Sequence, residues 1–166
     1  MSLHAALAHP QAVEQLVLIG ATAGIDSAAD RAKRRSDDEL LADRIETIGV
    51  EAFVDEWLQK PLFAGLTPDQ AMRVDRLRNT AVGLASSLRH AGTGTQAPLW
   101  DRLTEISCPV LLLVGQHDQK FKAIAERMTM ALPHAELRAI AGAGHSVHLE
   151  QPERTADALV DWLASQ

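Results

Sequence analysis

Three short apolar runs stand out in the hydrophobic pattern of the chain. They cover residues 13–21, 108–116 and 134–142, and the first two are continuous in Val, Leu and Ile and end in Gly. Continuous apolar runs of this length are typical of parallel strands that are buried on both faces. The third run is weaker and shows alternation instead. The pattern therefore predicts three parallel strands.

Helical periodicity follows the second and third runs. Residues 118–133 carry apolar side chains at helical spacing, and Pro133 closes the segment. Residues 151–166 show the same spacing, and Pro152 stands where a first-turn proline is tolerated. A strand–helix–strand–helix order predicts an α/β fold with right-handed crossovers.

The middle of the chain differs from both ends. Residues 28–104 contain no convincing strand, and several helical patterns are separated there by Pro and Gly. The apolar residues at helical spacing are Leu41, Ile45, Ile48, Phe53 and Trp57. So long an all-helical insertion between strands predicts a lid over an active site, and a helical subdomain without a catalytic role is the alternative. The expected division is a core of residues 1–27 and 105–166 with a lid of residues 28–104.

Composition and charge exclude several classes of protein. The net charge is −6 and no basic stripe offsets it, which argues against a nucleic-acid partner. The single cysteine, Cys108, excludes an internal disulfide and favours a buried structural thiol over a nucleophile. No apolar stretch approaches the roughly 18 residues that span a bilayer, and no secretory signal is visible. We therefore expect a cytoplasmic protein with neither a nucleic-acid nor a membrane partner.

Two polar residues come just past the carboxyl ends of predicted strands. Asp118 follows the second strand, and His145 follows the third in a Gly-rich loop. Loops at these ends form the binding crevice of open parallel sheets, so the two side chains are expected on one rim. An Asp beside a His fixes the imidazole tautomer and lets it act as a general base. Taken singly, each residue is also an ordinary loop residue. No metal ion and no organic cofactor is expected.

Sequence motifs around these two residues carry a family resemblance. "PVLLLVGQHD" and "GAGHSVHLEQPE" are similar to the acid and histidine segments of the α/β-hydrolase superfamily, and "HPQAVEQLVLIGATAG" resembles its segment after the nucleophile elbow. The resemblance implies a partial α/β-hydrolase fold, with the last three parallel strands, flanking helices and a helical lid. It also implies that Asp118 and His145 are the acid and base of a Ser–His–Asp triad.

A narrower resemblance comes from the segments "DRAKRRSDDELLADRIE", "FVDEWLQKPLFAGL", "RLRNT" and "GQHDQKF". They are similar to the 2-succinyl-6-hydroxy-2,4-cyclohexadiene-1-carboxylate synthases, lyases of menaquinone biosynthesis that eliminate pyruvate. The resemblance implies that Arg34, Trp57 and Arg78 contact a small polycarboxylate substrate, and guanidinium forks suit carboxylates. The alternatives are that both arginines pair with neighbouring aspartates and that Trp57 packs against Phe53.

The third triad member is not visible in the chain. The family carries it in G-x-S-x-G, and none of the eight serines has that glycine frame. The resemblance places the nucleophile a few residues before Met1, so we expect a truncated chain that is inactive alone. The strand at 13–20 would then have one unpaired edge and promote self-association. A carboxylic-ester or C–C bond hydrolase, or a non-catalytic fragment, remains as an alternative to the lyase.

Overall fold

The computed structural model describes residues 1–166 and divides them into two compact units. The sheet unit contains Met1–Ala23 and Leu99–Gln166, and the helical unit contains Gly24–Pro98. The partition thus places Trp100–Glu105, expected mostly in the lid, with the sheet unit. None of the helices combines the length and the apolar character that crossing a membrane requires.

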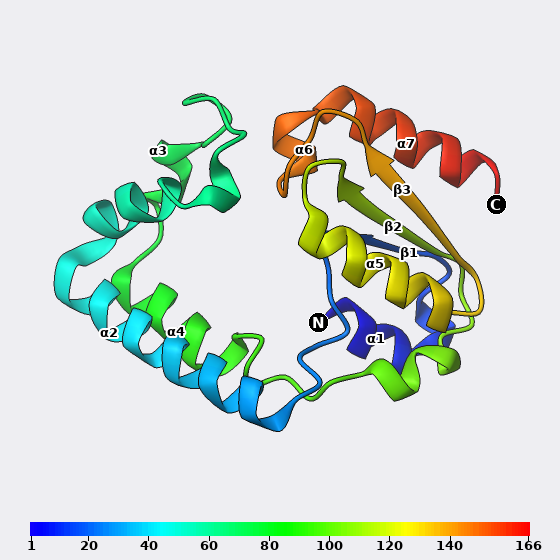
Figure 1. The fold of residues 1–166 in the computed structure, drawn as a ribbon, viewed down its shortest axis with the longest axis horizontal. Coiled ribbons are helices and arrows are strands. Elements are labelled where there is room, and N and C mark those ends of the chain that lie inside the picture. The colour runs from blue at the N-terminus through cyan, green and yellow to red at the C-terminus, as the bar shows by residue number, and fades with distance from the viewer. The chain divides into compact units, whose positions relative to one another are not determined.

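The sheet unit is built on three parallel strands in the order β1-β2-β3 (Figure 1). They are β1 (Leu16–Ile19), β2 (Val110–Gly115) and β3 (Ala135–Ile140). Each strand lies inside one of the three apolar runs, so the predicted parallel sheet is confirmed. The central strand β2 is buried at every position, which explains why its run is continuous rather than alternating.

Helices follow the strands as the periodicity predicts. The segment between β2 and β3 forms α5, and the segment after β3 forms α7 with Pro152 in its first turn. The bounds are α1 (Ser2–Ala8), η1 (Pro10–Ala12), η3 (Trp100–Glu105), α5 (Gln119–Ala131), α6 (Val147–Glu150) and α7 (Pro152–Ala164).

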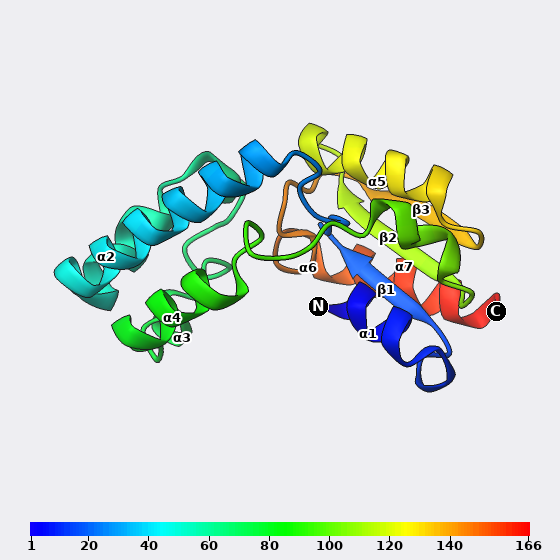
Figure 2. The same cartoon turned by 90° about the horizontal axis from the view of Figure 1, so that it is seen from below.

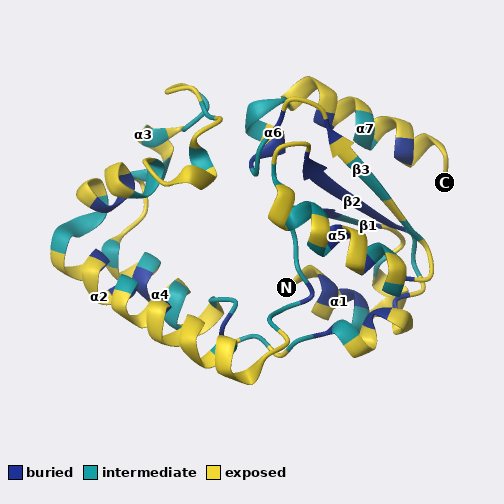
Figure 3. Cartoon of the chain, viewed as in Figure 1, coloured by how far each residue is buried: buried dark blue, intermediate teal, exposed yellow.

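Alternate residues of β2 face two separate hydrophobic clusters. Leu112 and its even-numbered neighbours pack with α1 and α5, whereas Leu111 and Leu113 pack with Val147 of α6 and Trp162 of α7. The burial colouring shows β2 as the most continuously buried element of the sheet (Figure 3). Apolar burial on both faces is the main stabilising contribution to this unit.

The helical unit packs α2 against α4 (Figures 1 and 2). Its elements are α2 (Ala28–Leu58), η2 (Pro61–Phe63), α3 (Arg73–Arg76) and α4 (Ala81–Ala91). The helix α2 is interrupted at Gly49, where φ is 80° and ψ is 169°. Before this break Ile45 is fully buried, and after it Phe53 is buried in the same cluster. The predicted helical periodicity is thus confirmed, and the interruption falls at the residue that best tolerates a positive φ.

Candidate active site

Asp118 and His145 meet at the carboxyl ends of β2 and β3. The Oδ2 atom of Asp118 lies 2.6 Å from Nδ1 of His145. Its Oδ1 atom accepts a hydrogen bond of 3.2 Å from the backbone N–H of Phe121 and so caps α5. The carboxylate of Asp118 therefore both caps the helix α5 and orients the imidazole of His145.

The surroundings of His145 leave one ring nitrogen available. Because Nδ1 faces a carboxylate, chemistry assigns the proton to Nδ1 and a lone pair to Nε2. No hydrogen bond engages Nε2, and no serine hydroxyl bonds the ring. The side chain of His145 is 24% exposed, while that of Asp118 is 9% exposed. The pair can therefore take up a proton from a group that approaches Nε2.

Close backbone approaches hold this arrangement together. At the end of β1, a Cβ on Gly20 would lie 3.1 Å from Cε1 of His145. At the end of β2, a Cβ on Gly115 would overlap the carbonyl oxygen of Gly144. The Phe121 ring packs against the imidazole with 4.6 Å between centroids. The ends of β1 and β2 and the helix α5 thus pack closely around the loop that carries His145.

Glu150 is a further residue of this site that the sequence reasoning missed. Its two carboxylate oxygens accept the backbone N–H groups of Gly144 at 2.7 Å and Ser146 at 2.9 Å, on either side of His145. This clamp fixes the loop backbone that carries the imidazole. The available signal was an acidic residue one turn after a Gly-rich loop, where unpaired backbone N–H groups need acceptors.

The two arginines expected to contact substrate belong to the helical unit. Arg34 donates from Nε to Oδ1 of Asp38 at 2.9 Å, and its side chain remains 43% exposed. Arg78 is 82% exposed and lies 3.8 Å from a carboxylate oxygen of Asp75. The alternative of neighbouring ion pairs is therefore realised for both, but each guanidinium keeps nitrogens that are open to a further carboxylate.

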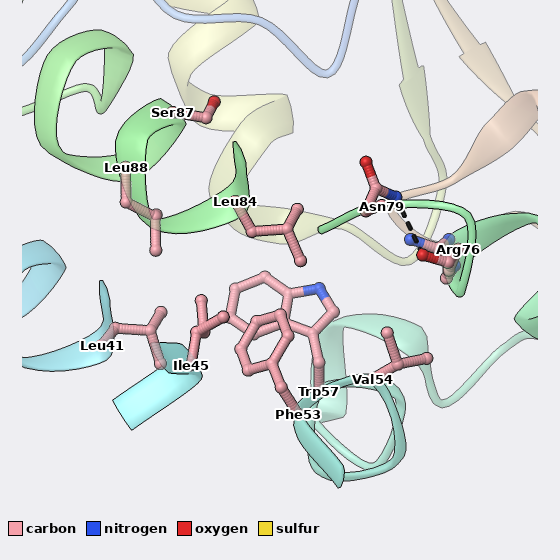
Figure 4. A pocket seen from close by; sticks show the side chains of 10 residues that line it. All are labelled: Leu41, Ile45, Phe53, Val54, Trp57, Arg76, Asn79, Leu84, Ser87 and Leu88. Carbon is pink, nitrogen blue, oxygen red and sulfur yellow. Dashed lines mark hydrogen bonds between the residues drawn. The ribbon is translucent and has the colours of Figure 1, made fainter. Parts of the chain in front are cut away.

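Trp57 lines an apolar cavity of about 220 Å³ within the helical unit (Figure 4). Its ring also packs against Phe53 with 5.6 Å between centroids and against Phe63 with 5.9 Å. The side chain of Trp57 thus both packs in the core of the helical unit and lines the cavity. The lining residues are Leu41, Ile45, Phe53, Val54, Trp57, Arg76, Asn79, Leu84, Ser87 and Leu88.

The remaining candidates for a nucleophile or a metal site are Cys108 and the clusters of His, Asp and Glu side chains. Burial raises the pKa of the Cys108 thiol, which favours its structural interpretation over a nucleophilic one. No group of three or more His, Cys, Asp or Glu side chains is placed so that it could hold a metal ion. The acid–base pair at Asp118 and His145 is therefore the chemistry that the sheet unit presents most clearly.

Comparison with known proteins places this chain in a family. Residues 1–158 match the family described as "Alpha/beta hydrolase family". The chain belongs to this family. In that family the acid of the triad precedes the histidine along the chain, and Asp118 precedes His145 here. The predicted resemblance and fold class are both confirmed.

Among curated proteins, the chain is similar to synthases of one kind. A Bacillus subtilis (strain 168) protein, which carries the name 2-succinyl-6-hydroxy-2,4-cyclohexadiene-1-carboxylate synthase provisionally, is 41% identical over 165 residues. That match covers 96% of this chain and 60% of the relative. The synthase of that name from Salmonella heidelberg (strain SL476) is 31% identical over 150 residues, covering 89% of this chain and 58% of the relative. The chain thus spans less than two thirds of these relatives.

Solved structures give the same likeness in three dimensions. MenH from S. aureus superposes with a TM-score of 0.95 at 31% identity, covering 99% of this chain and 64% of that one. A thermophilic esterase from Thermogutta terrifontis superposes with a TM-score of 0.74 at 25% identity, covering 92% and 56%. The similarity therefore extends to synthases and to esterases of the same fold.

Proposed function

We propose that this chain supplies the acid and base of a Ser–His–Asp lyase that eliminates pyruvate, as in the 2-succinyl-6-hydroxy-2,4-cyclohexadiene-1-carboxylate synthases. In this proposal the serine belongs to the part of the synthases that this chain does not match. The observation that carries the proposal is the 2.6 Å contact between Asp118 and His145, which leaves Nε2 unbonded. The likeness to the B. subtilis and S. aureus proteins supports the lyase assignment within the family.

The roles of the residues follow from their contacts. His145 receives the serine proton at Nε2, so that the activated triad can abstract a proton from the substrate. Asp118 keeps the other ring nitrogen protonated and stabilises the imidazolium that forms. Glu150 keeps the loop in place through two backbone hydrogen bonds. The sheet unit thereby performs proton transfer with its own side chains.

In the same proposal the helical unit is a lid that recognises a small polycarboxylate. Arg34 and Arg78 offer exposed guanidinium nitrogens, which bind carboxylates bidentately. Trp57 supplies apolar surface at the cavity of this unit. The reaction takes place in the cytoplasm, where the single cysteine stays reduced.

A hydrolase of a carboxylic ester or a C–C bond is the second candidate. The same triad attacks carbonyl carbon when water is the final acceptor, and the esterase from T. terrifontis shares this fold. In that case Arg34 and Arg78 would serve only their partners Asp38 and Asp75. The substrate that is turned over distinguishes the two candidates.

The test joins this chain to the missing nucleophile. The part of the B. subtilis relative that this chain does not match is fused ahead of residue 1, and the product is called the assembled enzyme. We expect it to release pyruvate from the succinyl-cyclohexadiene precursor and to lose this activity in His145→Ala. The 166-residue chain alone is the control, and we expect it to show little or no turnover. Hydrolysis of an aryl ester without pyruvate release would overturn the lyase assignment.

A further inference from the structure

The helical unit contains a buried carboxylate whose burial the hydrophobic core of that unit does not explain. Asp38, on α2, is only 5% exposed. Its Oδ2 atom is buried and has no hydrogen-bond partner. A buried charged oxygen without a donor is costly, because it loses the water that would solvate it. Because this burial destabilises the fold, we expect Asp38 to have a functional role.

The backbone at the end of α4 packs closely against that oxygen. A Cβ on Gly92, which follows the end of α4, would lie 2.5 Å from Oδ2 and 2.5 Å from the carbonyl oxygen of Leu88. The end of α4 therefore closes over the carboxylate, and only its other oxygen reaches a donor. That donor is Nε of Arg34, one helical turn earlier.

Arg34 differs from the other cations of the run "RAKRR". Arg31 donates to the carbonyl oxygens of Ile25 and Asp26. Lys33 pairs with Asp37, and Arg35 donates to the carbonyl oxygen of Gly94. Arg34 is held through Nε alone, so both of its terminal nitrogens remain unbonded within the helical unit.

We propose that Asp38 is a positioning residue, which holds the Arg34 guanidinium so that its terminal fork meets a substrate carboxylate. The inference rests on the proposed function, because that function gives Arg34 its ligand. An arginine held at Nε before binding loses less side-chain freedom when a carboxylate arrives. The buried carboxylate, with one oxygen lacking a donor, then lowers the stability of the fold but favours substrate binding.

The substitution Asp38→Asn separates positioning from a structural role. It keeps the shape of the side chain but replaces a charged acceptor by a neutral one, which makes a weaker hydrogen bond. We expect the midpoint of thermal unfolding to stay the same or rise, because a buried carboxylate oxygen that lacks a donor disappears. Affinity of the 166-residue chain for succinate, used as the dicarboxylate probe, should fall about tenfold. The matched control is Asp37→Asn, whose i,i+4 partner Lys33 is exposed, and it should change neither quantity.

The readout is nuclear magnetic resonance of the arginine Nε–H groups. In the unsubstituted chain the Arg34 Nε–H should exchange slowly with water and shift when succinate is added. Asp38→Asn should speed the exchange, whereas Asp37→Asn should not. Arg34→Lys, which keeps the charge but loses Nε–H, should weaken succinate binding to the same extent. The double variant should lose no more than either single variant, because both changes remove one interaction.

The outcomes separate the two claims. If succinate does not perturb Arg34 in the unsubstituted chain, the carboxylate-binding role of Arg34 is wrong and the positioning proposal falls with it. If succinate binds but Asp38→Asn leaves its affinity unchanged, only the positioning proposal is overturned. Should Asp38→Asn fail to fold, Arg34→Lys decides, and unchanged affinity in that variant overturns the proposal. In the assembled enzyme the supporting result is a raised KM for the polycarboxylate at unchanged kcat.

Discussion

At the scale of single residues, Asp118 links folding and chemistry through its two oxygens. One oxygen caps α5 and the other orients His145. Asn is as good a helix cap as Asp, but it is neutral and cannot stabilise an imidazolium. The two roles can therefore be separated by substitution.

We expect Asp118→Asn to abolish most activity while the fold stays nearly as stable. By analogy with other triads, kcat of the assembled enzyme should fall about 10⁴-fold. Asp118→Ala should lower activity as much and also cost about 1 kcal/mol of unfolding free energy through the lost cap. Steady-state kinetics and chemical denaturation measure the two effects. An equal loss of stability in both variants would contradict the separation.

Residue-scale chemistry was predicted from the sequence where it depends on strand order. Asp118 and His145 were found because parallel strands deliver their carboxyl ends to one rim. Glu150 was missed, because a carboxylate that accepts hydrogen bonds from the backbone leaves no periodic signal. Asp38 was considered only as one of several aspartates that could pair with the arginines, and its burial was not predicted. The ligand contacts of Arg34 and Arg78 stay predictions, because neither element order nor spacing fixes where a long side chain points.

At the scale of elements, the loop that carries His145 depends on the clamp from α6. Glu150→Gln replaces one carboxylate oxygen by an NH2 group, which cannot accept the N–H of Gly144 or Ser146. Leaving one part-buried donor unpaired should cost about 1–3 kcal/mol, mostly as local opening of the loop.

Hydrogen exchange measures that opening. We expect the amides of Gly144 and Ser146 to exchange faster in Glu150→Gln, and the assembled enzyme to lose kcat because the imidazole is less well oriented. Glu153→Gln, in the exposed first turn of α7, is the matched control and should leave both unchanged. Unchanged protection at both Gly144 and Ser146 in Glu150→Gln would contradict the clamp.

Exposed ion pairs on the helical unit respond to pH. Hydrogen bonds from Arg73, Arg89 and Arg44 lower the pKa of their partners Asp55, Glu46 and Glu56, respectively. The unfolded chain lacks these partners, so the pairs stabilise the folded state above the ordinary pKa values of 3.8 and 4.5. The contribution is lost as the pH falls through the lowered values.

Acidification should therefore destabilise the helical unit, in which Arg89 joins α4 to α2 and Arg73 joins α3 to α2. Added salt should reduce the difference, because the carboxylates are exposed. Amide exchange along α2 and α4, followed from neutral pH to below 4 after correction for intrinsic rates, measures the effect. Arg73→Gln, which removes the donor from Asp55, should flatten part of the pH dependence. A pH dependence that high salt leaves unchanged would argue against these ion pairs as its cause.

Element-scale prediction from the sequence was best where burial is complete. The runs that became β1 and β2 and the periodic segments that became α5 and α7 bury whole faces, so their patterns survive in the sequence. The break of α2 was not predicted, because Gly49 interrupts an otherwise unbroken polar and apolar pattern. Conformation at such a position depends on a single backbone angle rather than on periodicity.

At the scale of the whole molecule, β1 has a hydrogen-bonded neighbour on one side only. Ile19 on this strand is an exposed large hydrophobic residue. An open, apolar strand edge pairs readily with another strand, and a second copy of the chain presents the same edge. We therefore propose that the 166-residue chain self-associates through β1.

Sedimentation over a range of concentrations tests this proposal. The chain should form dimers or larger species, and Ile19→Lys should shift the equilibrium to monomer by placing a charge on the edge. Val160→Lys, at an exposed apolar position on α7, is the control and should not dissociate the species. Because the fused segment of the assembled enzyme would compete for the same edge, that enzyme should sediment as a monomer under conditions in which the chain alone associates. If the assembled enzyme and the chain associate equally, the contact lies elsewhere and β1 is not its site.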